Sequence, residues 1–422
     1  MCGRVTRMTL SEELKARGFI HQHTSESLSE ITDGEKRVIY HGIDPTADSA
    51  HAGNMVVWML LRRLSEAGHK VIFLVGGGTG MIGDPKPDSE RTLQTEEVIG
   101  TNVAKIKAQA ERLVGGDSSE VIFVNNKDWL LKQGLIEFLR DIGKHFTVNE
   151  LIKKDAIATR LSGDQGISYT EFAYPLLQAF DYLTLYREHG CDVQVGGSDQ
   201  WGNIIAGVEL VRRKEQKSVH AVTVPLVVDK ATGKKFGKSE GNAIWLDAEK
   251  TSPYAFYQFW LNVSDESVID YLKLFTFLTL EEIADLEKDF AENPGKRAAQ
   301  KRLAMEVTTF VHGADAATAV VRASSALFGE VSFSDLSDEE IKILKENAPT
   351  SSVSDGLPLV EVLVESDLAT SKREARTFIE GGAVQVNGEK IESVDAVLSK
   401  EESGALVLLK RGKKNMSLVE IG

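Results

Sequence analysis

Cysteine is almost absent from this sequence, whose 422 residues contain only Cys2 and Cys191. Two cysteines cannot form a disulfide framework or a zinc cluster, so disulfide-rich classes are excluded and no metal site is predicted. Long apolar runs are also absent, and the N-terminus lacks the basic-then-apolar pattern of a secretory signal. These absences predict a protein of the reducing cytoplasm with no membrane partner.

Basic residues are in deficit, with 49 Lys and Arg against 63 Asp and Glu, which gives a formal net charge of −14. This balance argues against indiscriminate nucleic-acid binding, although local basic patches remain possible. The apolar share of 42% and the charged share of 27% are those of an ordinary globular protein. Because the chain is too long for one compact core, two or three domains are expected.

The stretch RVIYHGIDPTADSAHAGN, residues 37–54, predicts a buried strand that breaks into a polar loop and then a helix from His51. Residues 70–75 predict the next strand, so the two strands should be parallel and joined by a right-handed crossover. His51 and Asn54 then lie in the first turn of a helix at the ligand-binding edge of the sheet, where an anion is expected. An ordinary helix start with a nearby histidine is the alternative.

Glycines follow the second strand with the spacing G-x-G-x-x-G at Gly78, Gly80 and Gly83. A dinucleotide-binding motif should open a helix at once, but the sequence Asp-Pro-Lys-Pro at residues 84–87 forbids a regular helix there. We therefore expect these glycines to let the backbone approach a ligand closely, with Asp84 as a buried carboxylate at the rim.

A predicted helix over residues 169–187 places Tyr174, Gln178 and Asp181 on one face of an otherwise apolar segment. Buried polar groups need partners, which here are a polar ligand or, alternatively, other side chains. A further strand then runs into Gly196 and Gly197, which let a flat group lie against the backbone. Asp199 and Gln200 follow, where a sugar or an amine can be held.

Residues 222–228 predict another strand, which leads into a glycine-broken loop that carries Lys230, Lys234, Lys235 and Lys238. A solvated surface is one interpretation of such a loop. Phosphate binding is the other, and the position of the loop after a sheet strand favours it. A helix from residue 135 carries an apolar stripe that fits either a core face or a dimer surface: Leu135, Phe138, Leu139, Ile142 and Phe146.

Beyond residue 247 the sequence predicts helices only, and one of them carries Lys296 and Arg297 on its outer face. Residues 346–356 have the composition of a linker. The last segment predicts a small separate domain with a basic helix over residues 371–379 and a tight hairpin at Asn387-Gly388.

Several of these motifs together resemble a known family. His51-Ala-Gly-Asn54 is similar to the HIGH signature of class I aminoacyl-tRNA synthetases, and the segment KFGKS at residues 235–239 is similar to their KMSKS loop. With the Tyr-Gln-Asp helix and the segment GGSDQW between them, the chain resembles the tyrosyl-tRNA synthetase family. Its last segment is similar to an S-four-type RNA-binding domain. The remaining alternatives are a tryptophanyl-type class I synthetase and a catalytically inactive RNA-binding paralogue.

The resemblance implies an α/β fold, in which a Rossmann-like parallel-sheet catalytic domain precedes an α-helical domain and a small α+β S-four-type domain. The expected bounds are 1–247 for the catalytic domain, 248–345 for the helical domain, which would bind the anticodon arm, and 357–422 for the last domain, after the linker. The implied activity is a tyrosine–tRNA ligase, an enzyme that uses L-tyrosine, ATP with Mg²⁺, and tRNA(Tyr) and that forms a homodimer.

The resemblance also implies roles for individual residues. For tyrosine, they are Tyr40 and Asp181 at the phenol, Asp84, Tyr174 and Gln178 at the amino group, Gln200 near the carboxylate, and Asn126 in the same wall. For adenosine, they are Asp44, Gly53, Gly197 and Asp199. For the phosphates, they are Thr46, His51, Lys86, Arg91, Lys235, Lys238 and Ser239. For tRNA, they are Lys296, Arg297, Lys372, Arg373, Arg376, Lys410, Arg411, Lys413 and Lys414. Asn54 replaces the last histidine of HIGH, and Asp88 interrupts the basic stretch after Asp84.

Overall fold

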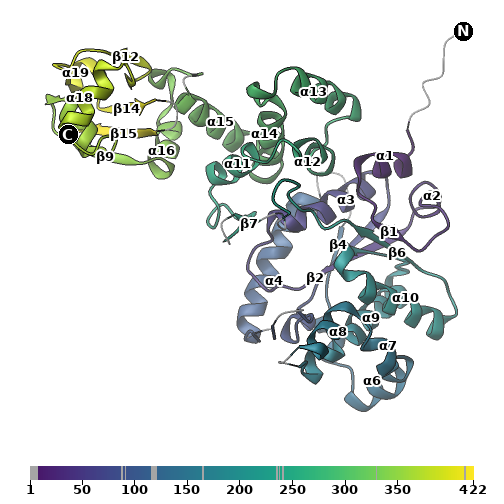
Figure 1. Cartoon of the computed structure of the whole chain (residues 1–422). Coiled ribbons are helices and arrows are strands. Elements are labelled where there is room, and N and C mark those ends of the chain that lie inside the picture. The colour runs from purple at the N-terminus through teal and green to yellow at the C-terminus, as the bar shows by residue number, and fades with distance from the viewer. Residues whose placement is uncertain are drawn as a thin grey trace, which may run out of the picture. The chain divides into compact units, whose positions relative to one another are not determined.

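The structure, a computed structural model, describes residues 8–86, 89–90, 92–115, 121–163, 166–233, 236, 238–239, 242–328, 330–412 and 415–422. For residues 155, 238, 239, 242, 328 and 334 it describes the backbone alone. The chain divides into two compact units (Figure 1), which are treated separately below. The first unit holds residues 1–250 and 263–303, and the second holds residues 251–262 and 304–422.

The first unit is built on a six-stranded sheet with the order β1-β6-β5-β2-β3-β4. Five strands are parallel, namely β2 (Val38–Ile43), β3 (Lys70–Val75), β4 (Val121–Asn125), β5 (Val193–Gly197) and β6 (His220–Val224). The short β1 (Gln22–His23) pairs antiparallel with β6 at the edge. The parallel sheet predicted from the sequence is thus confirmed. The strand expected over residues 222–228 ends at Val224 because Pro225 has no N–H to donate.

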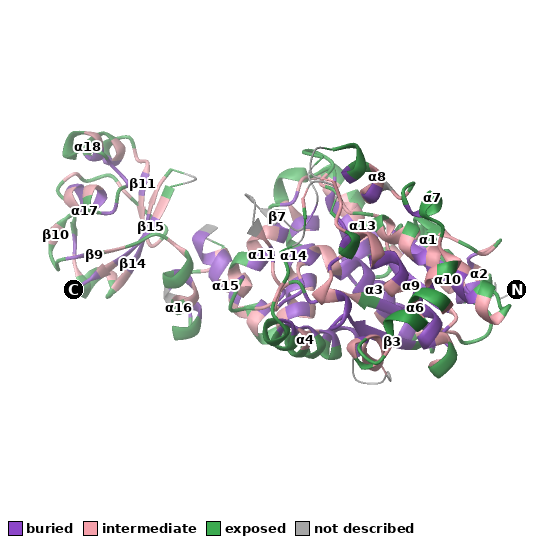
Figure 2. Ribbon diagram, turned by 90° about the horizontal axis from the view of Figure 1, so that it is seen from below, coloured by how far each residue is buried: buried purple, intermediate pink, exposed green. Residues whose placement is uncertain are grey.

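Helices cover both faces of this sheet (Figure 1). On one face, α9 (Tyr169–His189) and α10 (Trp201–Glu215) share a core with Tyr40, Ile72 and Leu74 of the strands. On the other face, α3 (Met55–Glu66) places Trp58 against Phe73, with ring centroids 5.4 Å apart. Figure 2 shows α3 and α9 mostly as buried residues.

The remaining helices of this part are shorter or lie at its surface: α1 (Leu10–Arg17), α2 (Ser29–Thr32), α4 (Glu96–Ala110), α5 (Lys127–Leu130), α6 (Leu135–Asp141), α7 (Val148–Leu151) and α8 (Asp155–Ser162). The apolar residues Leu10, Leu14, Phe19, Ile20 and Leu28 predict one helix over residues 9–32. That prediction is wrong, since Gly18 adopts φ +82° and ends α1 there. The first unit also contains α12 (Val268–Phe275), α13 (Leu280–Glu292) and the start of α14 (Ala298–His312).

The second unit joins helices and a small sheet around shared cores. Its helices are α11 (Pro253–Leu261), α15 (Ala314–Phe328), α16 (Asp338–Asn347), α17 (Leu359–Glu365), α18 (Lys372–Glu380) and α19 (Lys400–Ser403). The five-stranded sheet has the order β12-β11-β14-β15-β9: β9 (Thr350–Val353), β11 (Val384–Val386), β12 (Glu389–Ile391), β14 (Leu406–Arg411) and β15 (Asn415–Ile421). A separate pair is formed by β10 (Leu357–Pro358) and β13 (Val397–Leu398).

The linker expected over residues 346–356 is not observed. That stretch contains the end of α16 and all of β9, which pairs in parallel with β15. In addition, Leu344 of α16 shares a buried cluster with Leu408 and Leu418 of the sheet. The polar composition of the stretch is explained by its position at a sheet edge. The hairpin predicted at Asn387-Gly388 is confirmed, because both residues have positive φ and join β11 to β12. Of the helices described, none combines the length and apolarity that a membrane span needs.

Candidate active site

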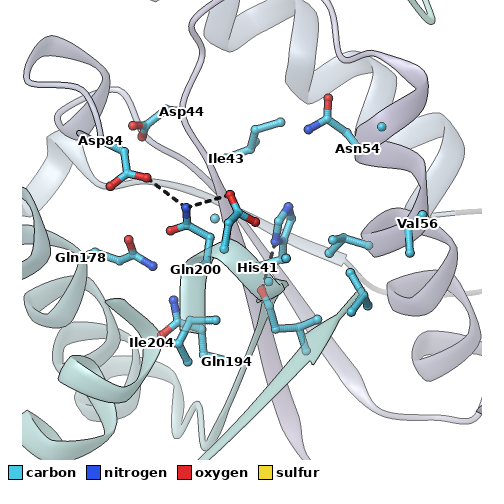
Figure 3. Close-up of a pocket in the computed structure, with 18 of the residues that line it drawn as sticks. His41, Ile43, Asp44, Asn54, Val56, Asp84, Gln178, Gln194, Gln200 and Ile204 are labelled. Atoms are coloured by element: carbon cyan, nitrogen blue, oxygen red, sulfur yellow. Dashed lines mark hydrogen bonds between the residues drawn. The ribbon is translucent and has the colours of Figure 1, made fainter. Parts of the chain in front are cut away.

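A cavity of about 430 Å³ opens at the carboxyl ends of β2 and β5, where a doubly wound sheet binds ligands (Figure 3). Residues from seven separate stretches of the sequence line it, within 40–46, 51–57, 74–84, 174–181, 194–204 and 224–227 and at Phe236. Those that the sequence predicted are Tyr40, Asp44, Thr46, His51, Gly53, Asn54, Asp84, Tyr174, Gln178, Asp181, Gly197, Asp199 and Gln200. The fold therefore brings these residues together, as expected from the two signature segments and the polar face of α9.

Asp181 and Tyr40 form the deep end of the cavity. Asp181 is buried, and its two carboxylate oxygens accept hydrogen bonds from Asn126 Nδ2 at 2.9 Å and Trp129 Nε1 at 2.8 Å. Burial raises the pKa of Asp181 to about 7, against the lowering effect of these two bonds. Asn126 thus stands behind Asp181 rather than in the cavity lining. The hydroxyl of Tyr40 is buried and has no hydrogen-bond partner among the described residues.

A second group of polar side chains lies nearer the strand ends. Gln200 Nε2 donates to Asp84 Oδ2 at 2.9 Å (Figure 3), and Asn203 Nδ2 donates to Asp84 Oδ1 at 3.1 Å. The hydroxyl of Tyr174 donates to Asp44 Oδ2 at 2.8 Å. Asp84 and Asp44 are therefore held in fixed positions, and both carboxylates border the cavity.

Thr79 connects these two groups. Its hydroxyl donates to Asp44 Oδ1 at 2.7 Å and accepts from Asn126 Nδ2 at 2.8 Å, so the hydrogen bonds run from Asp181 through Asn126 and Thr79 to Asp44. Sequence reasoning missed Thr79, Trp129 and Asn203. The glycine spacing drew attention to the residues on either side of Thr79, whereas Trp129 and Asn203 carry no local signal of a site.

The glycine run after β3 makes room for these side chains. A Cβ atom at Gly76 would lie 2.2 Å from Asp44 Oδ1 and 2.3 Å from Thr79 Oγ1, and one at Gly77 would lie 2.3 Å from Asn125 Oδ1. A three-residue 3₁₀ turn, Thr79–Met81, follows instead of a long helix. This agrees with the expectation that the motif does not form a dinucleotide-binding helix start.

The helix start after β2 is held by its own side chains. His51 Nδ1 accepts from the backbone N–H of Gly53 at 3.0 Å, and Asn54 Oδ1 accepts from the N–H of His51 at 3.0 Å. Asn54, which replaces a histidine of the family signature, thus closes a reciprocal cap on the 3₁₀ turn Ala52–Asn54 that leads into α3.

The lysine-rich loop and the segment after it are held to the first unit at two points. Within the loop, the N–H of Phe236 donates to Val227 O at 2.9 Å, and the ring of Phe236 stacks on that of Phe275 with centroids 5.2 Å apart. After the pair β7 (Lys238–Ser239) and β8 (Asn242–Ala243), the N–H of Ala52 donates to Ile244 O at 2.8 Å. This bond ties the end of the loop to the helix start.

Several expected phosphate contacts are not tested by the structure. Arg91 and Lys235 lie outside the described residues, and for Lys238 and Ser239 only the backbone is described. Lys86 is exposed and does not line the cavity. Its carbonyl oxygen and that of Ser89 accept from the buried Arg160 at 3.3 and 2.8 Å, so Arg160 anchors the backbone that follows Asp84.

The cationic residues expected to contact tRNA differ in the interactions that they make within their own unit. Arg373 and Arg376 are exposed on α18, whereas Lys372 pairs with Glu361 at 2.7 Å. Arg411 lies over the ring of Phe378 at 4.7 Å, and burial lowers the pKa of Lys410. In the first unit, Arg297 has a φ of +51° and donates to Val263 O, and Lys296 precedes it in the same turn. Lys413 and Lys414 lie outside the described residues.

Comparison with known proteins identifies the family. A family model described as "tRNA synthetases class I (W and Y)" matches residues 32–329, and a model described as "Tyrosine--tRNA ligase SYY-like C-terminal domain" matches residues 340–419. The second match begins within α16, in agreement with a C-terminal unit that includes this helix and β9.

Individual relatives distinguish the tyrosine members from the tryptophan members of this family. The chain is 49% identical over 418 residues to tyrosine–tRNA ligase 2 of Enterococcus faecalis, which covers 97% of this chain and 98% of that protein. It is also 49% identical over 417 residues to the tyrosine–tRNA ligase of Streptococcus mutans, with 96% and 98% covered. Among solved structures, a C-terminally truncated mitochondrial tyrosyl-tRNA synthetase of Aspergillus nidulans aligns with a TM-score of 0.69 at 33% identity, over 77% of this chain and 95% of that one. With this geometry and these matches, the chain belongs to the tyrosine–tRNA ligase family of the class I aminoacyl-tRNA synthetases.

Proposed function

We propose that this protein activates L-tyrosine with ATP to form tyrosyl-adenylate and pyrophosphate, and then transfers tyrosine to the terminal adenosine of tRNA(Tyr). The observation that carries this proposal is that one cavity holds Tyr40 and Asp181 at its deep end and His51 and Asn54 near the strand ends. A phenol at the deep end directs the amino acid carboxylate toward the helix start.

In this arrangement Tyr40 and Asp181 bind the phenol hydroxyl, and Asn126 and Trp129 orient the Asp181 carboxylate. The ammonium group binds at Asp84 and Gln178, with Gln200 near the carboxylate. Tyr174 binds the ammonium group as well, because its hydroxyl oxygen can accept a hydrogen bond while its O–H donates to Asp44. Adenosine lies along Asp44, Gly53, Gly197 and Asp199. Support for these positions comes from the cavity lining that they share.

Activation requires the tyrosine carboxylate to attack the α-phosphorus of ATP. A carboxylate is already ionised at pH 7, so this step needs no general base. Catalysis therefore depends on holding the two reactants in line and on neutralising the charge that develops on pyrophosphate. Thr46, His51, Lys235, Lys238 and Ser239 would supply this, with further contacts from Lys86 and Arg91. Mg²⁺ enters with the ATP phosphates and offsets part of their charge.

We further propose that the second unit and the cations at Lys296 and Arg297 bind tRNA, that the protein is a homodimer, and that it acts in the cytoplasm. The C-terminal domain match and the exposed arginines of α18 support the first point. Exposed Leu135 and Ile136 on α6 support the second. The bacterial relatives support the third.

The test of the amino acid specificity is exchange of labelled pyrophosphate into ATP against a panel of amino acids. Exchange should depend on tyrosine and should be far slower with phenylalanine or tryptophan. A site that pairs a hydroxyl discriminates against the analogue without it by about 10⁴–10⁵ fold, a magnitude that was measured in this same family. Faster exchange with tryptophan would contradict the proposal and favour the sister enzyme.

The loop lysines are tested by comparing Lys238→Ala with Lys230→Ala, since Lys230 lies in the same segment but pairs with Asp270 outside the cavity. If Lys238 acts mainly in the transition state, its removal should lower kcat about 10²–10³ fold with little change in the Kd of tyrosine. Lys230→Ala should retain nearly the wild-type rate. Equal rates of adenylate formation in both variants would show that this loop is an ordinary solvated surface without a catalytic role.

A further inference from the structure

Gln194 of β5 is a buried polar residue to which the reaction scheme above gives no role. Its side chain is 3% exposed and lines the cavity, and its Oε1 atom has no hydrogen-bond partner among the described residues. A buried carbonyl oxygen without a partner costs free energy, so the structure should provide a donor in some state of the protein. In this cavity, that donor can come from the bound substrate.

The strand register gives the depth at which Gln194 lies. Tyr40 of β2 is directly opposite Gln194 of β5 in a parallel pairing, so the two side chains leave the same face of the sheet. Gln194 also precedes Gly197, the last residue of β5, by three residues, which places it about 10 Å deeper along the strand. Asp84 and Gln200 lie beyond the strand ends, Gln200 in the 3₁₀ turn Ser198–Gln200 that leads into α10. Figure 3 shows Gln194 beside Ile204, on the side of the cavity away from Asp84.

Tyr40 and Gln194 therefore start at the same level of adjacent strands, and the hydroxyl of the one and the Oε1 of the other are buried without a partner among the described residues. The phenol of a bound tyrosine is the substrate group that reaches this depth if the proposed orientation holds, and its O–H is the one donor that it brings. Asp181 is also at this end, but each of its oxygens already accepts a hydrogen bond from Asn126 or Trp129.

We infer that Gln194 is a further specificity-determining residue, whose Oε1 accepts a hydrogen bond from the phenol hydroxyl of the bound amino acid. That O–H is shared between Gln194 and Asp181 as a three-centre bond, and the Tyr40 hydroxyl donates to the phenol oxygen. Gln194 thus favours para-hydroxylated aromatic amino acids over the unsubstituted ring. The inference rests on the proposed function, because it takes tyrosine as the substrate and the deep end as its phenol site.

In this role Gln194 has opposite energetic effects in the free and the tyrosine-bound protein. Without ligand, the unpartnered oxygen destabilises the protein, whereas with tyrosine bound it contributes a hydrogen bond. Leucine has nearly the same volume without the polar group, so Gln194→Leu should leave the thermal midpoint of the free protein unchanged or higher. A purely structural role for Gln194 predicts the reverse, since its loss would then lower the midpoint.

The experiment measures the ratio of kcat/KM for tyrosine over phenylalanine by pyrophosphate exchange, together with the thermal midpoint without ligand. Gln194→Leu should lower the ratio about 5- to 10-fold, through tyrosine alone, with the midpoint unchanged or raised. Gln194→Met repeats the test with an unbranched side chain in case the leucine variant folds poorly. Gln300→Leu is the matched control, because Gln300 is a fully buried glutamine that does not line the cavity and whose Oε1 also has no partner in the described part of the chain.

Two results would overturn the inference: an unchanged ratio in both Gln194 variants, or equal losses for tyrosine and phenylalanine. A lowered thermal midpoint with an unchanged ratio would assign Gln194 to packing. If the wild-type protein itself fails to exchange pyrophosphate with tyrosine, the proposed function is wrong. A wild-type preference for tyrosine that the Gln194 variants keep in full would contradict only the role of Gln194.

Discussion

Asp181 is the residue at which burial and hydrogen bonding have the most directly opposed effects. Burial disfavours its ionised carboxylate, whereas the two neutral donors that bond to it favour that form. Burial raises its pKa from 3.8 to about 7. Between these values the folded protein keeps the proton that the unfolded chain releases. This group therefore makes the free energy of unfolding fall as pH rises from about 4 to 7 and leaves it level above.

Asp181→Asn should remove that pH dependence, because asparagine does not titrate. The difference in unfolding free energy between wild type and variant should fall by about 4 kcal/mol at most across pH 4–7, with stability measured by urea unfolding without ligands. A difference that stays constant with pH would mean that Asp181 is ionised throughout. The same variant should also lose discrimination against phenylalanine.

Gly76 is the second residue whose substitution should strongly affect adenylate formation. Gly76→Ala would drive a methyl group against Asp44 and Thr79, so both side chains must move and adenylate formation should fall at least about 10-fold. Gly100→Ala in α4 is the control, because nothing lies within 4 Å of that Cβ position. It should retain activity and stabilise the protein by roughly 0.5–1 kcal/mol. Normal kinetics in Gly76→Ala would show that Asp44 need not stay in place.

At the scale of single residues, the sequence predicts those site residues that have a regular spacing or belong to short motifs. Tyr174, Gln178 and Asp181 are found from helix periodicity, and Asp199 and Gln200 from a glycine pair. Trp129 and Thr79 are not, because each acquires its role only by a hydrogen bond to a side chain distant in sequence, Thr79 to Asp44 and Trp129 to Asp181. Gln194 was missed for the same reason, since nothing next to it signals that its strand pairs with β2.

At the scale of elements, α6 shows what periodicity leaves open. Its apolar stripe divides on folding: Phe138 packs against Phe180 with ring centroids 5.8 Å apart, and Ile142 is buried. Leu135 and Ile136 are instead 71% and 73% exposed. The spacing alone cannot separate the two faces, because both repeat with the helical period.

The exposed face of α6 gives the dimer prediction. Ile136→Asp should shift the protein toward monomers in sedimentation velocity without loss of secondary structure, since it places a charge in the proposed apolar interface. Val98→Asp in α4 serves as the control, because Val98 is also exposed but lies outside that surface. If Ile136→Asp remains as dimeric as Val98→Asp, the interface lies elsewhere or does not exist.

Errors in the predicted elements have two causes. The apolar pattern predicts a strand past Pro225 and a helix through Gly18, although both residues are strong local breakers. Polar composition predicts a linker over residues 346–356, but β9 depends on a pairing with β15, more than sixty residues later in the chain. Composition carries no information about such a partner.

At the scale of the whole molecule, the two half-reactions should separate along the chain. The proposed tyrosine and ATP residues all belong to the first unit, and the α18 arginines belong to the second. Deleting the chain after Asn347 would not test this cleanly, because Leu344 shares a buried cluster with Leu408 and Leu418. Point substitutions of exposed cations leave that core intact.

Arg373→Glu combined with Arg376→Glu should therefore reduce aminoacylation while adenylate formation stays at the wild-type rate. Both side chains are exposed on α18, and charge reversal replaces two contacts that attract RNA phosphates with two that repel them. The advantage of the wild type over the double variant in aminoacylation should shrink as salt rises, because phosphate contacts release counterions.

The control is Lys342→Glu, because Lys342 is also an exposed cation of the second unit, on α16. Both reactions are measured on each protein at two salt concentrations. Normal charging by the double variant at low salt would remove α18 from tRNA binding, whereas loss of adenylate formation would show that the two units are coupled in the first step.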